Sequence, residues 1–501
     1  MNKNSIKSYK QLLKINQHLA YYEYTLSLLF WDDRVCMNPK SAKYRGKQIS
    51  ILTEYIHKTR TSKKYSKLIE SIDLDDFEKF SPEWVNFKWW KFEYERNKKI
   101  PPKLLAKLYE LIPVSIQAWE KAKEQKKYKI FSPYLSKIIE LNKEMIQKWG
   151  YKEEPYEALT IGYEIDITPS QINSIFEPLH KTLKQLISRG KYILQSPVDL
   201  KKIPFDQQKL EHFCKYLVKK ISGLDIRLDT TSHPFATTIL PYDVRITTRY
   251  NNLEGAIFGT LHELGHALYD YYLPQEEYFG QPISSSISLS IHESQSRFFE
   301  NVIGRSLAFW ELFYQDLKQY VPDLQNIPLE KFVLSANKIS MQPIRIEADE
   351  FTYNLHIILR FNLERKIFNE GVKVEELPEL WNTMFEEYFG YRPANDSVGI
   401  LQDIHWAESL FGYFPTYTLG NIISAQILNT IQKHINLYEE VKKGNFQIII
   451  QFLKENLYSL GKKYTTSEVV KKITNEEINS NHLISYLNSK ISFIEQNLSM
   501  I

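Results

Sequence analysis

The segment from residue 251 to residue 274 is the part of the sequence that most constrains the fold, because it predicts one amphipathic helix. Asn251 followed three residues later by Glu254 is typical of a capping box at a helix start, and Pro274 is typical of a helix end. Between these positions, apolar side chains recur at helical spacing, at Ile257, Phe258, Leu261, Leu264, Leu268 and Tyr272. The spacing therefore predicts a single helix around which the rest of the chain is organised.

Two histidines, His262 and His266, lie four residues apart on this helix. That spacing puts both imidazoles on one face, about one turn apart, where they can share one metal ion. Glu263 projects from the neighbouring face, where its carboxylate can reach a metal-bound water without binding the metal. The alternative is a helix with two surface histidines and a glutamate. Only 12 of the 501 residues are histidine, so the pattern rarely arises by chance.

A second helix, predicted over residues 286–304, supplies a third ligand. A tetrahedral catalytic zinc needs three protein ligands and one open position for water. Glu293 lies 27 residues beyond His266, and a glutamate on a following helix completes the gluzincin arrangement. The alternative for Glu293 is an ordinary surface carboxylate. His292 is either a group that contacts a ligand or a packed helix residue, and a carboxylate hydrogen-bonded to one of the two histidine ligands is expected.

Composition is that of an ordinary globular protein and argues against several classes of partner. The 64 basic and 60 acidic residues give a net charge of +4, which is too balanced to predict binding to nucleic acid or to an anionic membrane. The two cysteines, Cys36 and Cys214, exclude a disulfide framework and fit a reducing compartment. Residues 1–24 lack an apolar signal-peptide core, and no apolar run is long enough to cross a bilayer. We therefore expect a cytoplasmic protein.

Helical periodicity recurs along most of the chain, so the sequence predicts a mostly α fold. The best strand candidate is residues 243–248, just before the histidine-bearing helix, and a strand edge there could hold an extended peptide. Length alone suggests about two to four domains, but no Gly-, Ser- or Pro-rich linker separates regions of the chain. We expect one helical body with a small β ribbon beside the metal. The expected helices cover residues 5–30, 42–59, 204–220 and roughly 329–370, with a turn-like break over 31–39. Pro343 must kink the last of these helices or begin part of it.

Six separated motifs carry a resemblance to the thermostable carboxypeptidase family, family M32 of the metallopeptidases. All six occur in family order: His233-Pro234-Phe235; Asp243-x-Arg245-x-Thr247; His262-Glu263-x-x-His266; His292-Glu293-Ser294; Ile344-Arg345-x-x-Ala348-Asp349; and Gly399-x-x-Gln402-Asp403-x-His405-Trp406. Trp31-Asp32 and residues 412–417 are also similar to the family. The resemblance covers most of the chain.

The resemblance implies a mostly α-helical, gluzincin-like fold with a deep central groove. It implies one domain over residues 1–501, in which the helical segment over residues 1–100 lines or caps the groove. It also implies one divalent metal ion per chain, usually Zn²⁺ and sometimes Co²⁺, and a homodimer. The implied activity is that of a metallocarboxypeptidase, which removes C-terminal residues from peptides with a broad side-chain preference. Its metal ligands would be His262, His266 and Glu293, and its general base would be Glu263.

An exopeptidase must also bind the free terminal carboxylate, and the planar fork of an arginine matches a carboxylate. Arg345 is the predicted anchor, with Tyr417 as a helper, because the family assigns the matching positions to substrate binding. The alternative for Arg345 is an ion pair with Asp349, four residues on. Tyr417 and His405 are the candidates for the donor that stabilises the tetrahedral oxyanion.

The remaining motif residues have two interpretations each. Arg245 is a second candidate anchor, but Asp243, two residues earlier, equally favours a structural ion pair. His233, before Pro234, is either a substrate contact or a loop-packing residue. Packing is the favoured role for the last three, which are Gln402, Asp403 and Trp406.

Two other functions fit parts of the pattern. A zinc endo-oligopeptidase of the helical, grooved kind shares the metal motif, but the motifs at Arg345 and at residues 402–406 favour the carboxypeptidase. A metal-free peptide-binding scaffold would have lost Glu263 or a ligand, and this sequence retains all of them. An aminopeptidase is disfavoured because no Gly-x-Met-Glu-Asn-like segment precedes the metal helix.

Overall fold

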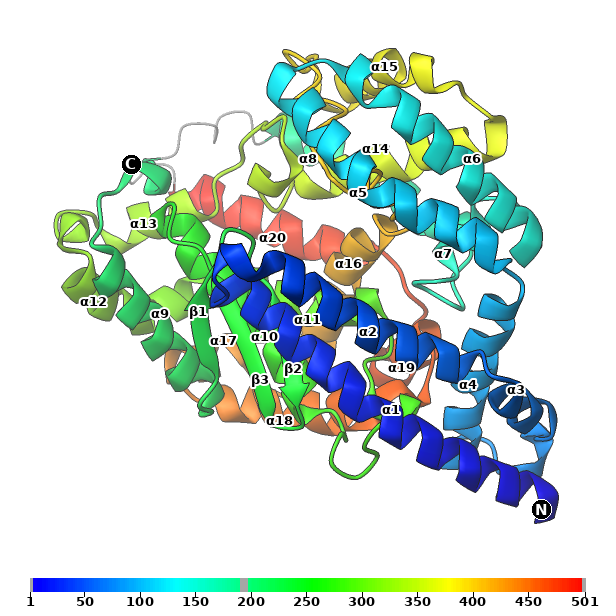
Figure 1. The fold of residues 1–501 in the computed structure, drawn as a ribbon. Coiled ribbons are helices and arrows are strands. Elements are labelled where there is room, and N and C mark those ends of the chain that lie inside the picture. The colour runs from blue at the N-terminus through cyan, green and yellow to red at the C-terminus, as the bar shows by residue number, and fades with distance from the viewer. Residues whose placement is uncertain (1–2, 190–196, 498–501) are drawn as a thin grey trace. The chain divides into compact units, whose positions relative to one another are not determined.

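The computed structural model describes residues 3–189 and 197–497 and confirms a mostly α-helical fold with a small sheet (Figure 1). The chain forms two compact units, each built from three separated segments. Unit 1 comprises Met1–Glu95, Pro197–Ala336 and Ile427–Asn475, and unit 2 comprises Arg96–Ser196, Asn337–Gln426 and Glu476–Ile501. The single domain over 1–501, its deep groove and the capping role of residues 1–100 stay predictions.

Unit 1 contains a three-stranded sheet and the helices around it. β1 (Arg227–Thr230) pairs in parallel with β3 (Asp243–Thr248), and β2 (Ala236–Leu240) pairs antiparallel with β3, in the order β1-β3-β2. β3 covers the predicted strand, and α10 (Leu253–Tyr272) packs against β3 and β2. The other helices wholly or mainly in unit 1 are α1 (Lys3–Val35), α2 (Ala42–Arg60), α3 (Lys63–Glu70), α4 (Pro82–Lys98), α9 (Gln207–Ser222), α11 (Leu289–Arg297), α12 (Leu307–Tyr320), α13 (Leu329–Ala336), α17 (Leu437–Lys442), α18 (Phe446–Asn456) and α19 (Thr466–Thr474).

The histidine-bearing helix α10 forms as predicted, except at its first residue. Asn252, rather than Asn251, is the N-cap, because its extended backbone lets the side-chain oxygen accept from the Gly255 N–H at 2.7 Å. Glu254 lies 3.5 Å from Arg305 instead of closing a capping box. The predicted apolar stripe is buried except at its last residue, Tyr272, which is half-buried. Exposures are at most 2% for Ile257, Phe258, Leu261, Leu264 and Leu268.

The N-terminal helix α1 is longer than predicted, since the expected break at 31–39 starts only after Val35. Trp31 is 1% exposed, and its ring lies 5.5 Å from that of Phe235, so the helix continues to bury this side chain. The helix ends where the Met37 N–H donates to the carbonyl oxygen of Asp32 at 2.7 Å. α1 packs against α2 and against β2.

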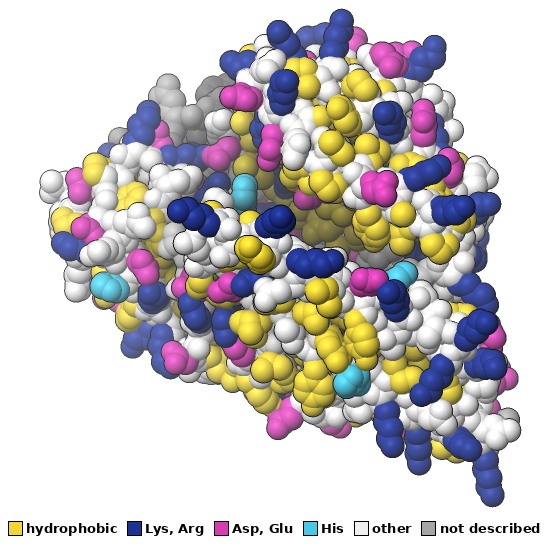
Figure 2. Space-filling model, in the orientation of Figure 1, with side chains coloured by type: hydrophobic (Ala, Val, Ile, Leu, Met, Phe, Trp, Pro, Cys, Tyr) yellow, Lys and Arg dark blue, Asp and Glu magenta, His cyan; other side chains and the backbone are white. Residues whose placement is uncertain are grey.

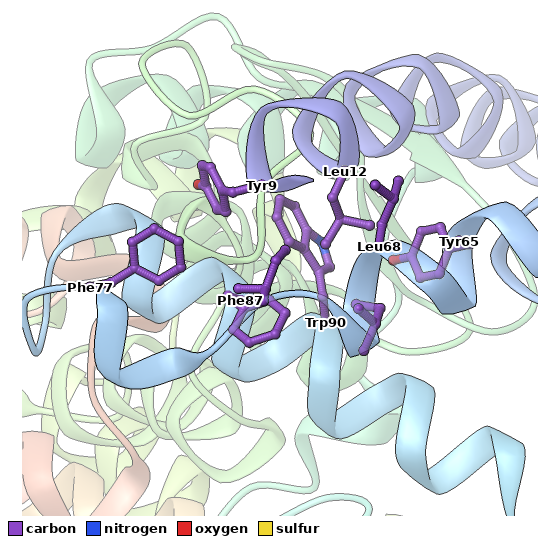
Figure 3. Close-up of a cluster of buried hydrophobic side chains, with 9 residues drawn as sticks. Tyr9, Leu12, Tyr65, Leu68, Phe77, Phe87 and Trp90 are labelled. Atoms are coloured by element: carbon purple, nitrogen blue, oxygen red, sulfur yellow. The ribbon is translucent and has the colours of Figure 1, made fainter. Parts of the chain in front are cut away.

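A buried cluster of aromatic and aliphatic side chains joins the N-terminal end of α1 to α3 and α4 (Figure 3). Burial of such side chains stabilises a fold by roughly 1.5–3 kcal/mol each. This cluster therefore fixes the start of α1, the helix whose later turns pack on β2. Its members are Tyr9, Leu12, Tyr65, Leu68, Ile69, Ile72, Phe77, Phe87 and Trp90.

The predicted long helix over residues 329–370 is wrong between residues 337 and 352, where the chain is not a continuous helix. α13 ends at Ala336, and α14 (Tyr353–Arg365) begins only after a segment that contains Pro343. Proline lacks an N–H and restricts the residue before it, which opposes a continuous helix. Asp349 orders the segment, because its carboxylate accepts from the backbone N–H groups of Ser340 and Thr352 at 2.9 and 3.1 Å.

Unit 2 consists of helices and the loops between them, and its described residues form no strand. In this unit α8 packs against α14 and α20, and α5 packs against α6. Within the described residues of the chain, no helix combines the length and the hydropathy that crossing a bilayer requires. Besides α14, the helices wholly or mainly in unit 2 are α5 (Pro102–Gln125), α6 (Ser132–Trp149), α7 (Glu157–Thr160), α8 (Pro169–Arg189), α15 (Leu377–Phe389), α16 (Pro415–Gln432) and α20 (Asn481–Asn497).

Candidate active site

Two helices of unit 1 bring together three side chains that could hold a metal ion. His262 and His266 come from α10, and Glu293 comes from α11. Glu293 Oε2 lies 3.7 Å from His262 Nε2 and 3.5 Å from His266 Nε2. A tetrahedral site with arms of about 2.1 Å has edges of about 3.4 Å, so two imidazoles and a carboxylate at this spacing fit one zinc-like ion. Among residues 3–189 and 197–497, no other such group of three was found.

Gly265 explains how α10 and α11 come so close. A Cβ added at this position would lie 2.6 Å from Ser296 Cα and would also strike the carbonyl of Gln295. Carbon atoms prefer separations of about 3.5–4.0 Å, so only glycine allows this approach. The glycine between the two histidines therefore sets the distance from α10 to the helix that carries Glu293.

Gly265→Ala should force α11 away from α10. We expect a destabilisation of about 1–3 kcal/mol and an at least tenfold loss of Zn²⁺ affinity, since Glu293 moves with its helix. Thermal unfolding and calorimetric zinc titration would measure the two effects. The control is Gly46→Ala on α2, where an added Cβ meets nothing within 4 Å. Unchanged zinc affinity in Gly265→Ala would show that this contact does not position Glu293.

One carboxylate holds His262 in place. Glu300, on the π-helical turn Phe298–Ile303 that follows α11, lies 2.8 Å from His262 Nδ1. His262 therefore holds its proton on Nδ1 and turns Nε2 toward Glu293. Burial opposes the charge of Glu300, but Arg297, His262 and Arg305 outweigh burial and hold its pKa at about 2. The expected carboxylate partner of a histidine ligand is thus Glu300, which sequence reasoning did not identify.

His266 has a different partner, because His292 Nδ1 lies 2.6 Å from His266 Nδ1. His292 Nε2 in turn lies 2.9 Å from Asp270 Oδ1. With His266 Nε2 turned toward Glu293, His266 Nδ1–H donates to His292, and His292 Nε2–H donates to Asp270. Of the two roles predicted for His292, contact with a ligand is the one the geometry supports. Asp270 was not singled out, although it follows His266 by four residues on the same helix face.

The third ligand is held by an arginine that sequence reasoning also missed. Arg297 Nε donates to Glu293 Oε1 at 2.7 Å, which leaves Oε2 facing the histidines. Arg297 Nη1 also donates to Glu300 at 3.2 Å. Burial opposes the charge of Glu293, but Arg297 and His262 outweigh burial and hold its pKa well below the usual range. The spacing of Glu293 and Arg297, four residues apart, was the signal available in the sequence.

Glu263 lies on α10 beside the first histidine and is 6% exposed. Burial raises its pKa to about 7, with the Glu293 carboxylate adding to the rise and His262 opposing it. A carboxyl group with a pKa near neutrality can both take up and release a proton at neutral pH. The geometry therefore allows a proton-transfer role for Glu263.

Glu300→Gln should weaken metal binding without removing a ligand. The amide keeps the size of the side chain but loses the negative charge that stabilises the Nδ1 proton of His262. We expect a roughly 10–100-fold loss of Zn²⁺ affinity, as for other groups that orient metal ligands. Competition with a chromophoric chelator would measure this loss. Glu211→Gln on α9, whose carboxylate pairs with Lys215 at the surface, is the control and should bind zinc as the unchanged protein does. Equal Zn²⁺ affinity in both variants would show that Glu300 does not contribute to metal binding.

Two of the predicted substrate contacts, Arg245 and His233, lie in or next to the sheet of unit 1. Arg245 donates to Asp243 through Nε at 2.8 Å and through Nη2 at 2.7 Å, and its guanidinium lies 5.7 Å from the centre of the Trp31 ring. This is the ion pair predicted as the alternative to a substrate anchor. His233 is exposed on the connection between β1 and β2.

In unit 2, Arg345 pairs with Asp403. Its Nε and Nη2 donate to Asp403 Oδ1 at 3.1 and 2.9 Å, and Nη1 donates to the Tyr353 hydroxyl at 2.9 Å. Asp349 was the wrong partner, because its oxygens are taken by backbone N–H groups. Arg360 Nε also donates to Asp403, at 2.7 Å. Burial opposes the charge of Asp403, but the two arginines outweigh burial and keep its pKa well below the usual range.

His405 and Tyr417 lie together in unit 2, with His405 Nε2 3.3 Å from the Tyr417 hydroxyl. Burial lowers the pKa of His405 to about 3, so the ring is neutral at pH 7. The guanidinium of Arg345 lies 5.0 Å from the centre of the Tyr417 ring. The structure thus groups three of the predicted substrate residues: Arg345, His405 and Tyr417.

The other residues of the last motif have packing partners, as favoured from the sequence. Gln402 accepts from the Arg345 backbone N–H at 2.7 Å and donates to the Pro343 carbonyl at 3.0 Å. Trp406 Nε1 donates to the buried carboxyl of Glu364 at 2.7 Å. These bonds hold the motif around Arg345.

Comparisons with known proteins match nearly the whole chain. The family model described as carboxypeptidase Taq (M32) metallopeptidase matches residues 11–491. Carboxypeptidase 1 of Bacillus subtilis (strain 168) is 37% identical over 494 residues, which cover 96% of this chain and 98% of that protein. A solved structure of Pyrococcus furiosus carboxypeptidase is 35% identical, covers 98% of this chain and 99% of that one, and has a TM-score of 0.93. Trypanosoma cruzi metallocarboxypeptidase 1 is 30% identical, with 97% and 100% covered and a TM-score of 0.92. Together with the site geometry, these matches show that the chain belongs to the carboxypeptidase Taq (M32) metallopeptidase family and is a metallocarboxypeptidase.

Proposed function

We propose that His262, His266 and Glu293 bind the catalytic divalent ion of this carboxypeptidase, and that Glu263 is its general base. The observation that carries the proposal is the convergence of three candidate ligand atoms. Beside them, the buried Glu263 lies on the same helix as the two histidines. The donor set of two imidazoles and one carboxylate suits Zn²⁺, and Co²⁺ is the alternative ion. Bound there, the ion would supply Lewis acidity that lowers the pKa of water and polarises the scissile carbonyl.

The protein's own groups then handle the protons. Glu263 takes a proton from the attacking water and returns it to the leaving amide nitrogen, since a pKa near 7 suits both transfers. Glu300 and His292 keep His262 and His266 in fixed tautomers throughout. Tyr417 and His405 are the proposed donors to the oxyanion.

The edge strand β2 can orient the peptide. The Thr247 backbone N–H of β3 donates to the Phe235 carbonyl at 3.0 Å, and the Phe235 N–H donates to the Thr247 hydroxyl at 2.9 Å. The alternate residues Ala236 and Thr238 therefore direct their N–H and C=O groups away from β3. An extended peptide could add to such an edge through its main chain. This supports binding of substrates without a strong side-chain preference.

Arg345 is the proposed anchor for the terminal carboxylate, with Tyr417 beside it. Two guanidiniums, those of Arg345 and Arg360, share the single carboxylate of Asp403. A buried cluster with more positive than negative charge favours an added anion. His233 and Arg245 are proposed as secondary contacts of the substrate. Arg245 is placed after Arg345 because it already pairs with Asp243.

A homodimer and a cytoplasmic location complete the proposal. The homodimer rests on the family resemblance, and the location rests on the low cysteine content. The balanced charge argues against nucleic acid as a partner.

One experiment tests the ion and the mode of cleavage together. An acetylated peptide with a free C-terminus is incubated with the protein, with a chelator-treated sample, and with that sample after addition of Zn²⁺ or Co²⁺. We expect a ladder of products that lose single C-terminal residues, absent after chelation and restored by either ion. Internal fragments would indicate an endo-oligopeptidase, and no cleavage with either ion would indicate a binding scaffold.

A further inference from the structure

A second feature of unit 1, a pocket of about 400 Å³, has no role in the reaction described above. Its size is within the range of about 300–1,000 Å³ that is usual for sites of small molecules. Its walls come from α1, α2, α4, β2, the end of α10, the segment that precedes α11 and the segment that follows α18. All of these walls belong to unit 1.

The pocket adjoins the candidate metal site. Asp270, which lines the pocket, follows His266 by one helical turn on α10 and accepts from His292 at 2.9 Å. Thr238 lines the pocket from β2 and donates its hydroxyl to Asp270 at 3.2 Å. A peptide added along the edge of β2 would therefore lie next to this pocket and to the candidate metal ligands.

Negative charge predominates in the pocket. Its lining contains three carboxylates, those of Glu23, Glu93 and Asp270, and two cations, Arg60 and Lys462. Glu23 pairs with Arg60 at 2.8 Å, and the Lys462 ammonium lies 4.1 Å from the centre of the Trp89 ring. Within the described residues Glu93 forms no ion pair, so one carboxylate remains uncompensated.

A buried acceptor without a partner provides an independent indication of a ligand. Gln275 lines the pocket, is 8% exposed, and has no hydrogen-bond partner for Oε1 among the described residues. Its Nε2 donates to the Asp270 carbonyl at 3.1 Å, which fixes the orientation of the amide. A buried carbonyl oxygen without a donor costs about 1–3 kcal/mol, so a ligand that donates hydrogen bonds would relieve this cost.

We propose that this pocket binds a cationic group of the peptide substrate, from the residues that precede the scissile bond. Carboxylates and an acceptor oxygen suit an ammonium or guanidinium and repel the C-terminal carboxylate, so the terminal residue is excluded. The cation is either a Lys or Arg side chain or the free N-terminal ammonium of a short peptide. The inference rests on the proposed function, because it assumes that the peptide runs along β2 past the metal.

The test compares matched peptides that end in a free carboxylate. Lysine is placed in turn at each of the three positions before the scissile bond, against norleucine at the same position, with acetylated and free N-termini. We expect a roughly tenfold higher kcat/KM for one cationic form, through KM, since a hydrogen bond to a charged group has about this effect. Glu93→Gln should reduce the ratio to about two. Glu54→Gln, at an exposed pair with Lys58 on α2, should leave both the ratio and the activity unchanged.

Equal kcat/KM for all cationic and neutral forms would overturn the inference while the carboxypeptidase function stands. A preference that survives in Glu93→Gln would also overturn it. If no peptide is cleaved, the proposed function fails. Calorimetric binding of the same lysine and norleucine peptides to the zinc-loaded protein then tests separately whether the pocket binds a cation. In that measurement a tenfold difference in Kd that Glu93→Gln abolishes would support the inference, and equal Kd values would reject it.

The surface around these elements is of mixed charge, with Lys, Arg, Asp and Glu side chains interspersed over the face that Figure 2 shows. A general attraction of cationic peptides to the whole protein is therefore not expected, since the net charge is +4. A preference for one lysine position over the other two would thus report a local site.

Discussion

Glu263→Gln should lower kcat by roughly 10²–10⁴-fold, because the amide cannot accept a proton from water. The side chain is 6% exposed and does not belong to the three ligands, so the variant should bind Zn²⁺ as tightly as the unchanged protein. KM should change little, since the glutamine occupies the same space. Steady-state hydrolysis of an acetylated peptide, with zinc content measured on the same sample, tests the prediction.

A matched variant separates the base from the ligand. Glu293→Gln should lose both zinc and activity, because it weakens the carboxylate ligand that Arg297 holds at 2.7 Å. Added Zn²⁺ should therefore restore some of the activity of Glu293→Gln and none of that of Glu263→Gln. If the kcat of Glu263→Gln is within tenfold of that of the unchanged protein, Glu263 is not the general base.

Arg345→Lys should abolish most of the preference for a free C-terminus. Lysine keeps the charge but not the planar fork, and it cannot reproduce the two bonds to Asp403. We expect kcat/KM for free-acid peptides to fall by roughly 10²-fold, in line with the cost of disrupting a buried charge pair. Peptides with a C-terminal amide should be poor substrates for both proteins. The ratio of kcat/KM for free-acid peptides to kcat/KM for amide peptides should therefore fall in the variant.

The arginine is 7% exposed, so its substitution also threatens the fold. Circular dichroism and thermal unfolding of Arg345→Lys should therefore accompany the kinetics. Arg392→Lys, at a surface pair with Glu379 and Glu386 in the same unit, is the control and should keep the full acid preference. An Arg345→Lys protein that is folded and keeps the ratio of acid to amide would show that Arg345 only supports Asp403.

Local patterns were enough to predict the helix that carries His262 and His266 and the strand that precedes it. The apolar stripe of α10 and the i, i+4 spacing of His262 and His266 depend on residues within two helical turns, where side-chain direction follows from helix geometry. The strand at 243–248 was equally local, since alternation fixes which residues face the sheet. The family motifs extended this local information to Glu293, which lies on a separate helix.

Only the tertiary structure decided which polar groups hold the candidate metal ligands and the proposed anchor, Arg345. Glu300 reaches His262 because α11 continues into a π-helical turn, and Asp403 reaches Arg345 from 58 residues away. The predicted partner of Arg345, Asp349, was local in sequence, but its oxygens are used by backbone N–H groups where Pro343 breaks the helix. Pairings of buried charges depend on which chain segments meet, and a sequence pattern of short range carries no information about that meeting.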